Sequence, residues 1–417
     1  TAASLYNMVD SIFIGQGVGP LAISGLAVTF PLMNLSTAFG TLVGAGAATM
    51  LSILLGQKNY KAANKVLGSV VTLNIIIGLI FMAIALIFID PILYFFGASE
   101  NTLPFAKEYM QIILYGNIIT HLYFGLNAAM RSSGNPKKAM ALTIFTVVFN
   151  TILDPIFIFG FDMGVRGAAT ATVISQAISA TWVLRFLTGR KAILRLRWKR
   201  LGVAPHRLKA IFSLGLPGFV MQGTNSLVSI VCNNQLQTYG GDLYVGIMTI
   251  LNSVREMLSL PMTGITHGTQ PIIGFNYGAK KNERVKEGIR FAAIVGALYL
   301  LCAWLVIMLI PEQMIAIFSD EPETITIGAQ MLNIYFFGFV FMTFQSAGQM
   351  AFQALGYAKQ AIFFSLFRKA IIVVPLTLLF PAIGFGVEGV FLAEPVSNLV
   401  GGLAAFTAMW FMIYRKL

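Results

Sequence analysis

The chain has 417 residues, of which 57% are hydrophobic and only 11% are charged. A soluble globular domain is about 45–50% apolar and about 25% charged, so this composition excludes a water-soluble enzyme, a disordered scaffold and a free nucleic-acid binder. Its two cysteines exclude a disulfide framework. The composition predicts a polytopic helical membrane protein, in which the placement of the net charge of +12 matters more than its size.

Apolar runs long enough to cross a bilayer recur along the chain. A helix of about 20 apolar residues spans the hydrocarbon core. We predict twelve such spans, near residues 1–14, 21–55, 66–89, 103–130, 138–161, 165–188, 210–238, 243–277, 289–310, 324–355, 360–381 and 387–414. Because the first run is short, we expect the chain to begin partway through its first span.

Lysine and arginine collect in alternate loops between these runs. The basic loops lie near residues 58–65, 131–138, 190–209, 280–290 and 359, and a further basic pair ends the chain. Positive charge marks the cytoplasmic side of a membrane protein. Both termini and the central polar break are therefore predicted to be cytoplasmic.

The second half of the sequence repeats the first with a shift of 222 residues. Glycines and loop lysines keep this register, as in Gly46/Gly268, Lys58/Lys280, Gly116/Gly338, Gly134/Gly356, Lys137/Lys359 and Ser175/Ser397. Two six-helix lobes related by a pseudo-twofold axis along the membrane normal are the expected result, which is a layout of secondary transporters. We predict an N-terminal lobe over 1–188 with a truncated first helix, a cytoplasmic linker over 189–209 and a C-terminal lobe over 210–417.

Ionisable side chains inside the predicted spans indicate function, because they are costly at bilayer depth. Asp10 and Asp154 belong to the N-terminal half alone, since the shift pairs them with Cys232 and Leu376. Asn150 and Asp154 share one helix face, and Thr172 and Gln176 lie on a polar stripe of the next span. Such oxygens bind Na⁺, and the carboxylates could carry a proton instead. The alternative is a structural Asp154 that hydrogen-bonds to Asn150 without an ion.

The C-terminal half has its own charges at bilayer depth. Glu394 and Arg368 lie on neighbouring spans and are expected to pair, whereas Lys369 lies near enough to the cytoplasmic end to extend toward water. Arg255 and Glu256 point to different faces of one helix, so each needs its own partner. Static ion pairs and substrate contacts both remain open for these residues.

Three motifs of the sequence occur together. They are Tyr6-Asn7-Met8-Val9-Asp10-Ser11, Arg131-Ser132-Ser133-Gly134-Asn135-Pro136, and Asn150-Thr151-Ile152-Leu153-Asp154-Pro155 followed by Gly164-Val165-Arg166-Gly167. Together they resemble the multidrug and toxic compound extrusion (MATE) family, and within it the branch with DinF-like and MepA-like exporters. The resemblance implies a cation site at Asp10, Asn150, Asp154 and Thr172, with Tyr6 and Asn127 near it. Another branch of the family places its cation-binding acids in the C-terminal lobe, and Glu256 and Glu394 keep such a second coupling site open here.

The resulting hypothesis is a cation-coupled antiporter that exports amphipathic, often cationic drugs by alternating access. We expect a monomer in the bacterial cytoplasmic (inner) membrane, with Na⁺ or H⁺ as coupling ion, no other metal or cofactor and no nucleic-acid partner. The alternative is a flippase for lipid-linked precursors, which would need a basic cavity. An intramembrane enzyme is not expected, because the sequence has no phosphate-binding loop and no nucleophile or metal set at usable spacing.

Overall fold

The computed structural model describes residues 13–14, 18, 20–96, 98–189, 192–197, 201–202, 204–318 and 321–417. Every regular element in these ranges is a helix, which confirms the all-α fold class. The chain forms two compact units, Thr1–Gly218 and Phe219–Leu417. The limits of the lobes and linker given above remain predictions.

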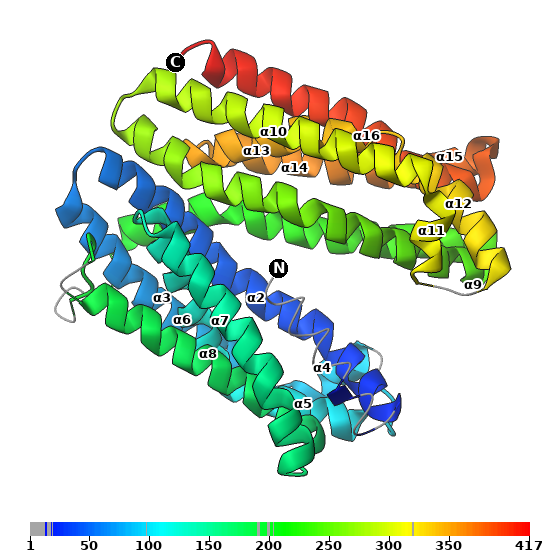
Figure 1. Cartoon of the computed structure of the whole chain (residues 1–417), viewed down its shortest axis with the longest axis horizontal. Coiled ribbons are helices and arrows are strands. Elements are labelled where there is room, and N and C mark those ends of the chain that lie inside the picture. The colour runs from blue at the N-terminus through cyan, green and yellow to red at the C-terminus, as the bar shows by residue number, and fades with distance from the viewer. Residues whose placement is uncertain are drawn as a thin grey trace. The chain divides into compact units, whose positions relative to one another are not determined.

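The first unit is a bundle in which α3, α6, α7 and α8 lie side by side (Figure 1). Gly116 separates α5 from α6, and a positive φ of 84° at Gly134 allows the tight turn before α7. Its elements are α2 (Pro20–Gly56), α3 (Tyr60–Ile87), α4 (Ile89–Phe95), α5 (Leu103–Tyr115), α6 (Asn117–Ser132), α7 (Pro136–Pro155), the π-helical η1 (Ile156–Gly160) and α8 (Gly164–Thr188).

Small residues let the helices of this bundle approach closely. A Cβ on Gly44 of α2 would lie 3.4 Å from the Cα of Gly125 on α6. Gly125 also leaves room for the side-chain amide of Asn74 from α3. A Cβ on Gly125 would lie 2.2 Å from Asn74 Nδ2. Polar side chains can therefore be buried between α2, α3 and α6.

The second unit is a bundle in which α10, α13, α14 and α16 pack together (Figure 1). Helix α9 (Pro205–Gly278) starts before the boundary between the units and is broken at Gly241, where φ is 73°. The other elements are α10 (Asn282–Leu309), α11 (Pro311–Ala316), α12 (Pro322–Phe336), η3 (Phe339–Phe341), α13 (Met342–Ala354), α14 (Ala358–Leu366), η4 (Phe367–Val373), α15 (Val374–Phe380), η5 (Pro381–Phe385), α16 (Gly386–Met409) and η6 (Trp410–Tyr414).

The helices coincide with the predicted spans from 21–55 onward, whereas the first span lies outside the described residues except for Phe13 and Ile14. Within the described ranges, six helical segments are long and apolar enough to cross a membrane, and the pair α12 and α13, bent by 42°, makes a seventh. The remaining spans are broken, as at Gly116, or polar, as in α9 around Arg255 and Glu256.

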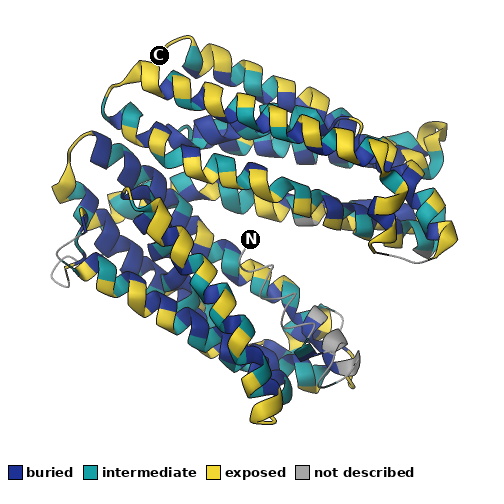
Figure 2. Ribbon diagram, in the orientation of Figure 1, coloured by how far each residue is buried: buried dark blue, intermediate teal, exposed yellow. Residues whose placement is uncertain are grey.

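Figure 2 shows many exposed positions along the helices in yellow, and large apolar residues occupy many of them. Ile80, Ile84 and Ile87 follow one face of α3 and are each more than half exposed. A helix that is apolar all round is expected in lipid. The structure is therefore that of a multi-pass membrane protein.

Candidate functional site

Asn150, Asp154 and Thr172 meet in the interior of the first unit. The side-chain amide of Asn150 donates to Asp154 Oδ1 at 3.0 Å and to Thr172 Oγ1 at 3.3 Å. Helix α7 supplies the first two residues, four positions apart, and α8 supplies the third. All three are at most 3% exposed. The structure thus brings these three predicted residues together, and we call them the α7–α8 cluster.

The donor set of this cluster suits a small cation. Asn150 Oδ1 is buried and has no hydrogen-bond partner among the described residues. Together with the Asp154 carboxylate and the Thr172 hydroxyl it offers hard oxygen ligands, the type that alkali and alkaline-earth cations accept. Asp10 and Tyr6, the predicted contributors from the first span, lie outside the described residues.

A cavity of about 40 Å³ lies beside the α7–α8 cluster. Thr172, Gln176, Thr120, Asn117 and Ser36 contribute to its lining. Gln176 accepts a hydrogen bond from Thr120 of α6. About 10–15 Å³ of such space holds one water molecule, so the cavity can hydrate the cluster. Gln176 therefore lines the same cavity as Thr172 of the cluster.

Ser36 and Asn117, which line this cavity, belong to a buried polar network that the sequence analysis did not predict. Ser36 of α2 donates to the Asn117 side chain and lies 3.1 Å from His121 Nε2. Asn117 in turn donates to the carbonyl of Gly78 on α3 at 3.1 Å. Asn117 and His121 are four residues apart on α6, but only the packing of α2 and α3 against α6 brings Ser36 and the Gly78 carbonyl to them.

Asn127 of α6 contacts α7 farther from Asp154 than the resemblance implied. Its side chain donates to the Ala139 carbonyl at 3.2 Å and to Thr143 Oγ1 at 3.5 Å. Thr143 precedes Asn150 by seven residues, which is about 10 Å along a helix. Asn127 thus bridges α6 and α7 and is not part of the α7–α8 cluster.

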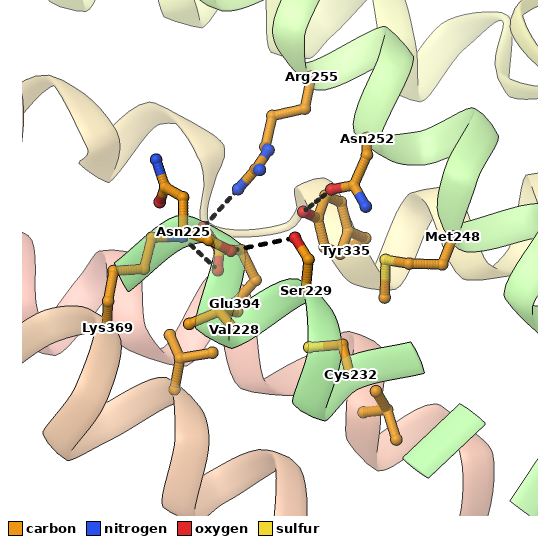
Figure 3. A pocket seen from close by; sticks show the side chains of 12 residues that line it. Asn225, Val228, Ser229, Cys232, Met248, Asn252, Arg255, Tyr335, Lys369 and Glu394 are labelled. Carbon is orange, nitrogen blue, oxygen red and sulfur yellow. Dashed lines mark hydrogen bonds and ion pairs between the residues drawn. The ribbon is translucent and has the colours of Figure 1, made fainter. Parts of the chain in front are cut away.

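A second charged cluster lies in the second unit, around Glu394 of α16. Its Oε1 accepts from Arg255 Nη1 of α9 at 3.1 Å, from Arg368 Nη1 of η4 at 3.1 Å and from Lys369 Nζ at 3.0 Å. Figure 3 shows Arg255 and Lys369 reaching the carboxylate from different elements. We call these four residues the Glu394 cluster.

The pairing of Arg368 with Glu394 is confirmed, but the expected position of Lys369 is wrong. Lys369 is only 3% exposed, and its Nζ donates to both oxygens of Glu394. The attraction of a buried carboxylate therefore outweighs extension toward water. Arg255 also finds its partner in Glu394, whereas the adjacent Glu256 is exposed and forms no ion pair with a described residue.

The sequence matches a known family along most of its length. The MatE family model matches residues 2–156 and 217–379. The chain is 27% identical to the multidrug export protein MepA of Staphylococcus haemolyticus, covering 98% of this chain and 89% of that protein. It is also 27% identical to MepA of Staphylococcus aureus strain MSSA476, covering 98% and 90%.

Solved structures show the same fold. A MATE protein in its bent conformation superposes with a TM-score of 0.94 at 23% identity, covering 100% of this chain and 93% of that one. The MATE multidrug transporter DinF-BH, solved in complex with a ligand, superposes with a TM-score of 0.90 at 34% identity, covering 99% and 92%. These matches confirm the twelve-helix fold, the resemblance to the MATE family and the prediction that the protein is a transporter and not an enzyme. The chain belongs to the MatE family of membrane transporters.

Proposed function

We propose that the protein is a multidrug efflux antiporter that exports amphipathic, often cationic compounds in exchange for Na⁺ or H⁺. The relatives named above are multidrug export proteins, and DinF-BH is a multidrug transporter that was solved with a ligand bound. The proposed partners are accordingly small organic molecules and the lipid bilayer. We propose that no cofactor besides the coupling ion is required.

The buried carboxylate of the α7–α8 cluster is the observation that carries this proposal. Asp154 is 0% exposed within an apolar span, where an unused ionised group is disfavoured. Cation binding there compensates for the charge and can bias one conformation of the transporter. Coupling then requires only that cation and drug favour opposite-facing states or compete for the same state.

The distribution of basic loops supports a definite orientation. We propose that the protein lies in the bacterial cytoplasmic membrane as a monomer with both termini in the cytoplasm. In this orientation most of the lysines and arginines of the loops are cytoplasmic, as the positive-inside rule requires.

A flippase for lipid-linked precursors is the less favoured function. It would recognise an anionic pyrophosphate, whereas the α7–α8 cluster is suited to a cation. The relatives named above are also multidrug exporters. We therefore do not propose flippase activity.

Efflux of rhodamine 123, a permanently cationic dye, from proteoliposomes tests the proposal. A sodium gradient and a pH gradient are imposed separately, and dye movement against its own gradient is expected with one of them. The Asp154→Asn protein should show no gradient-driven movement. Dye movement that ignores both gradients would contradict antiport.

A further inference from the structure

The Glu394 cluster contains more positive than negative charge. Arg255, Arg368 and Lys369 all pair with the single carboxylate of Glu394. Its four side chains are between 4% and 27% exposed, so water screens them weakly. Charges inside a membrane protein are stable when they are paired or bind a ligand of opposite sign. Glu394 carries one negative charge, so two of the three positive charges in this cluster are not balanced within it.

A cavity of about 180 Å³ opens beside the unbalanced charge, entirely within the second unit. Arg368, Lys369 and Ser365 line one part of it, and in the rest the methionines Met221, Met262, Met342 and Met350 alternate with threonine, serine, glutamine and histidine side chains. An apolar cavity of about 150 Å³ holds a benzene molecule, and thioethers make favourable contacts with aromatic rings. The space therefore suits an aromatic ring that carries a negative group.

Donors for a negative group remain available at this cavity. Among the described residues, Arg368 donates only through Nη1, to Glu394 and to Asn398 at 2.5 Å. Its Nε and Nη2 edge can therefore bind a carboxylate with two hydrogen bonds.

Ser365 offers a further donor, one turn before Lys369. Its hydroxyl is buried and has no partner within the described part of the chain. A helical serine commonly donates to the carbonyl four residues earlier. Here that carbonyl, of Ala361, accepts from Gln349 Nε2 at 2.9 Å. A buried hydroxyl without a partner is unfavourable unless a ligand or water binds it.

We propose that this cavity binds the carboxylate of a carboxylated aromatic compound, held by Arg368, Lys369 and Ser365, with the ring among the methionines. The inference rests on the proposed function, because it gives those exported compounds that carry an aryl carboxylate a binding place in the second unit. Glu394 then acts as an internal competitor, since its own carboxylate occupies donors that the ligand would use.

Rhodamine 110 and rhodamine 123 form a matched pair of probes, because the second is the methyl ester of the first. Fluorescence anisotropy with the purified full chain measures the dissociation constant of each dye. Ser365→Ala should weaken rhodamine 110 roughly tenfold, the equivalent of one hydrogen bond to a charged group, and leave rhodamine 123 unchanged. Lys369→Met should weaken rhodamine 110 further, while Glu394→Gln should strengthen it.

Ser365→Ala removes no ion pair, so the proposal is testable even where charge variants do not fold. Equal loss of both dyes, or unchanged binding of rhodamine 110 to Ser365→Ala, would overturn the carboxylate site. Failure of gradient-driven rhodamine 123 efflux would instead overturn the proposed function, because that dye has no free carboxylate. The two failures are therefore distinguishable.

Discussion

The substitution Asp154→Asn separates a coupling role of this residue from a structural one. The change keeps the size of the side chain and removes its negative charge. A charge at bilayer depth costs about 2.5–3.5 kcal/mol. The hydrogen bond from Asn150, 3.0 Å long, contributes about 1.5–3 kcal/mol to a carboxylate but about 0.5–1.5 kcal/mol to a neutral acceptor.

The difference predicts that the variant is more stable than the wild type. About 3 kcal/mol of insertion cost is removed and about 1–1.5 kcal/mol of hydrogen bonding is lost, so the free energy of unfolding should rise by about 1–2 kcal/mol. Cation-driven efflux should nevertheless disappear. A gain in stability with a loss of activity is typical of a residue retained for function.

Two measurements on the same preparation test this reasoning. Thermal unfolding in detergent follows stability, and rhodamine 123 efflux from proteoliposomes follows coupling. Asp162→Asn is the matched control, because Asp162 is an exposed acid in the same unit with φ of 53°, a conformation that asparagine tolerates. An Asp154→Asn protein with a lower unfolding midpoint, or with retained gradient-driven efflux, would refute the coupling role.

Three further substitutions test the packing of the two units. Thr146→Val should lower the free energy of unfolding by about 1–3 kcal/mol, because the Ser179 hydroxyl, 2.6 Å from Thr146 Oγ1, loses this hydrogen-bond partner. The measurement is thermal unfolding, and Thr181→Val at an exposed position is the control. Gly338→Ala should lower the free energy of unfolding by about 1–3 kcal/mol in the same assay, because the new Cβ would lie 2.6 Å from the Pro395 carbonyl oxygen. Gly246→Ala is its control, because a Cβ at Gly246 meets nothing within 4 Å and should not destabilise the protein. Gly401→Ser should displace Arg368, whose Cγ lies 2.6 Å from the new Cβ, and weaken rhodamine 110 binding without changing rhodamine 123 binding.

The membrane fold was predictable because several apolar runs are long enough to cross a bilayer as helices. The run at 66–89 became α3, and the run at 138–161 became α7 with η1. The π-helical turns η1, η4, η5 and η6 were not predicted, because an apolar run indicates a helix without distinguishing its hydrogen-bond pattern. The break in α9 was predicted as the gap between the spans 210–238 and 243–277, and it falls at Gly241, whose φ is positive.

The sites were predictable only where their residues are close in sequence or related by the duplication. The spacing of Asn150 and Asp154 places them on one helix face, and the structure joins Thr172 to them. The convergence of Arg255, Arg368 and Lys369 on one carboxylate requires knowledge of which faces of α9, η4 and α16 meet. The same holds for Ser36, Asn117 and His121, which come from two helices.

The duplication explains how one packing scheme came to hold clusters of opposite charge. With the shift of 222 residues, Arg368 and Gly401 correspond to Thr146 and Ser179, and Glu394 corresponds to Thr172. In the first unit Thr146 and Ser179 are in direct contact. In the second unit the loss of the serine side chain makes room for the arginine stem, which lies against Gly401.

The other exchanges follow from the same change. Ile372 and Leu376 replace Asn150 and Asp154, so the second unit has lost the acid of the α7–α8 cluster. An arginine buried at the position of Thr146 needs a counter-charge, and Glu394 supplies it from the position of Thr172. Lys369 and Arg255 then add positive charge that this carboxylate cannot balance. One unit is thereby suited to a cation and the other to an anionic group, although both derive from one ancestral bundle.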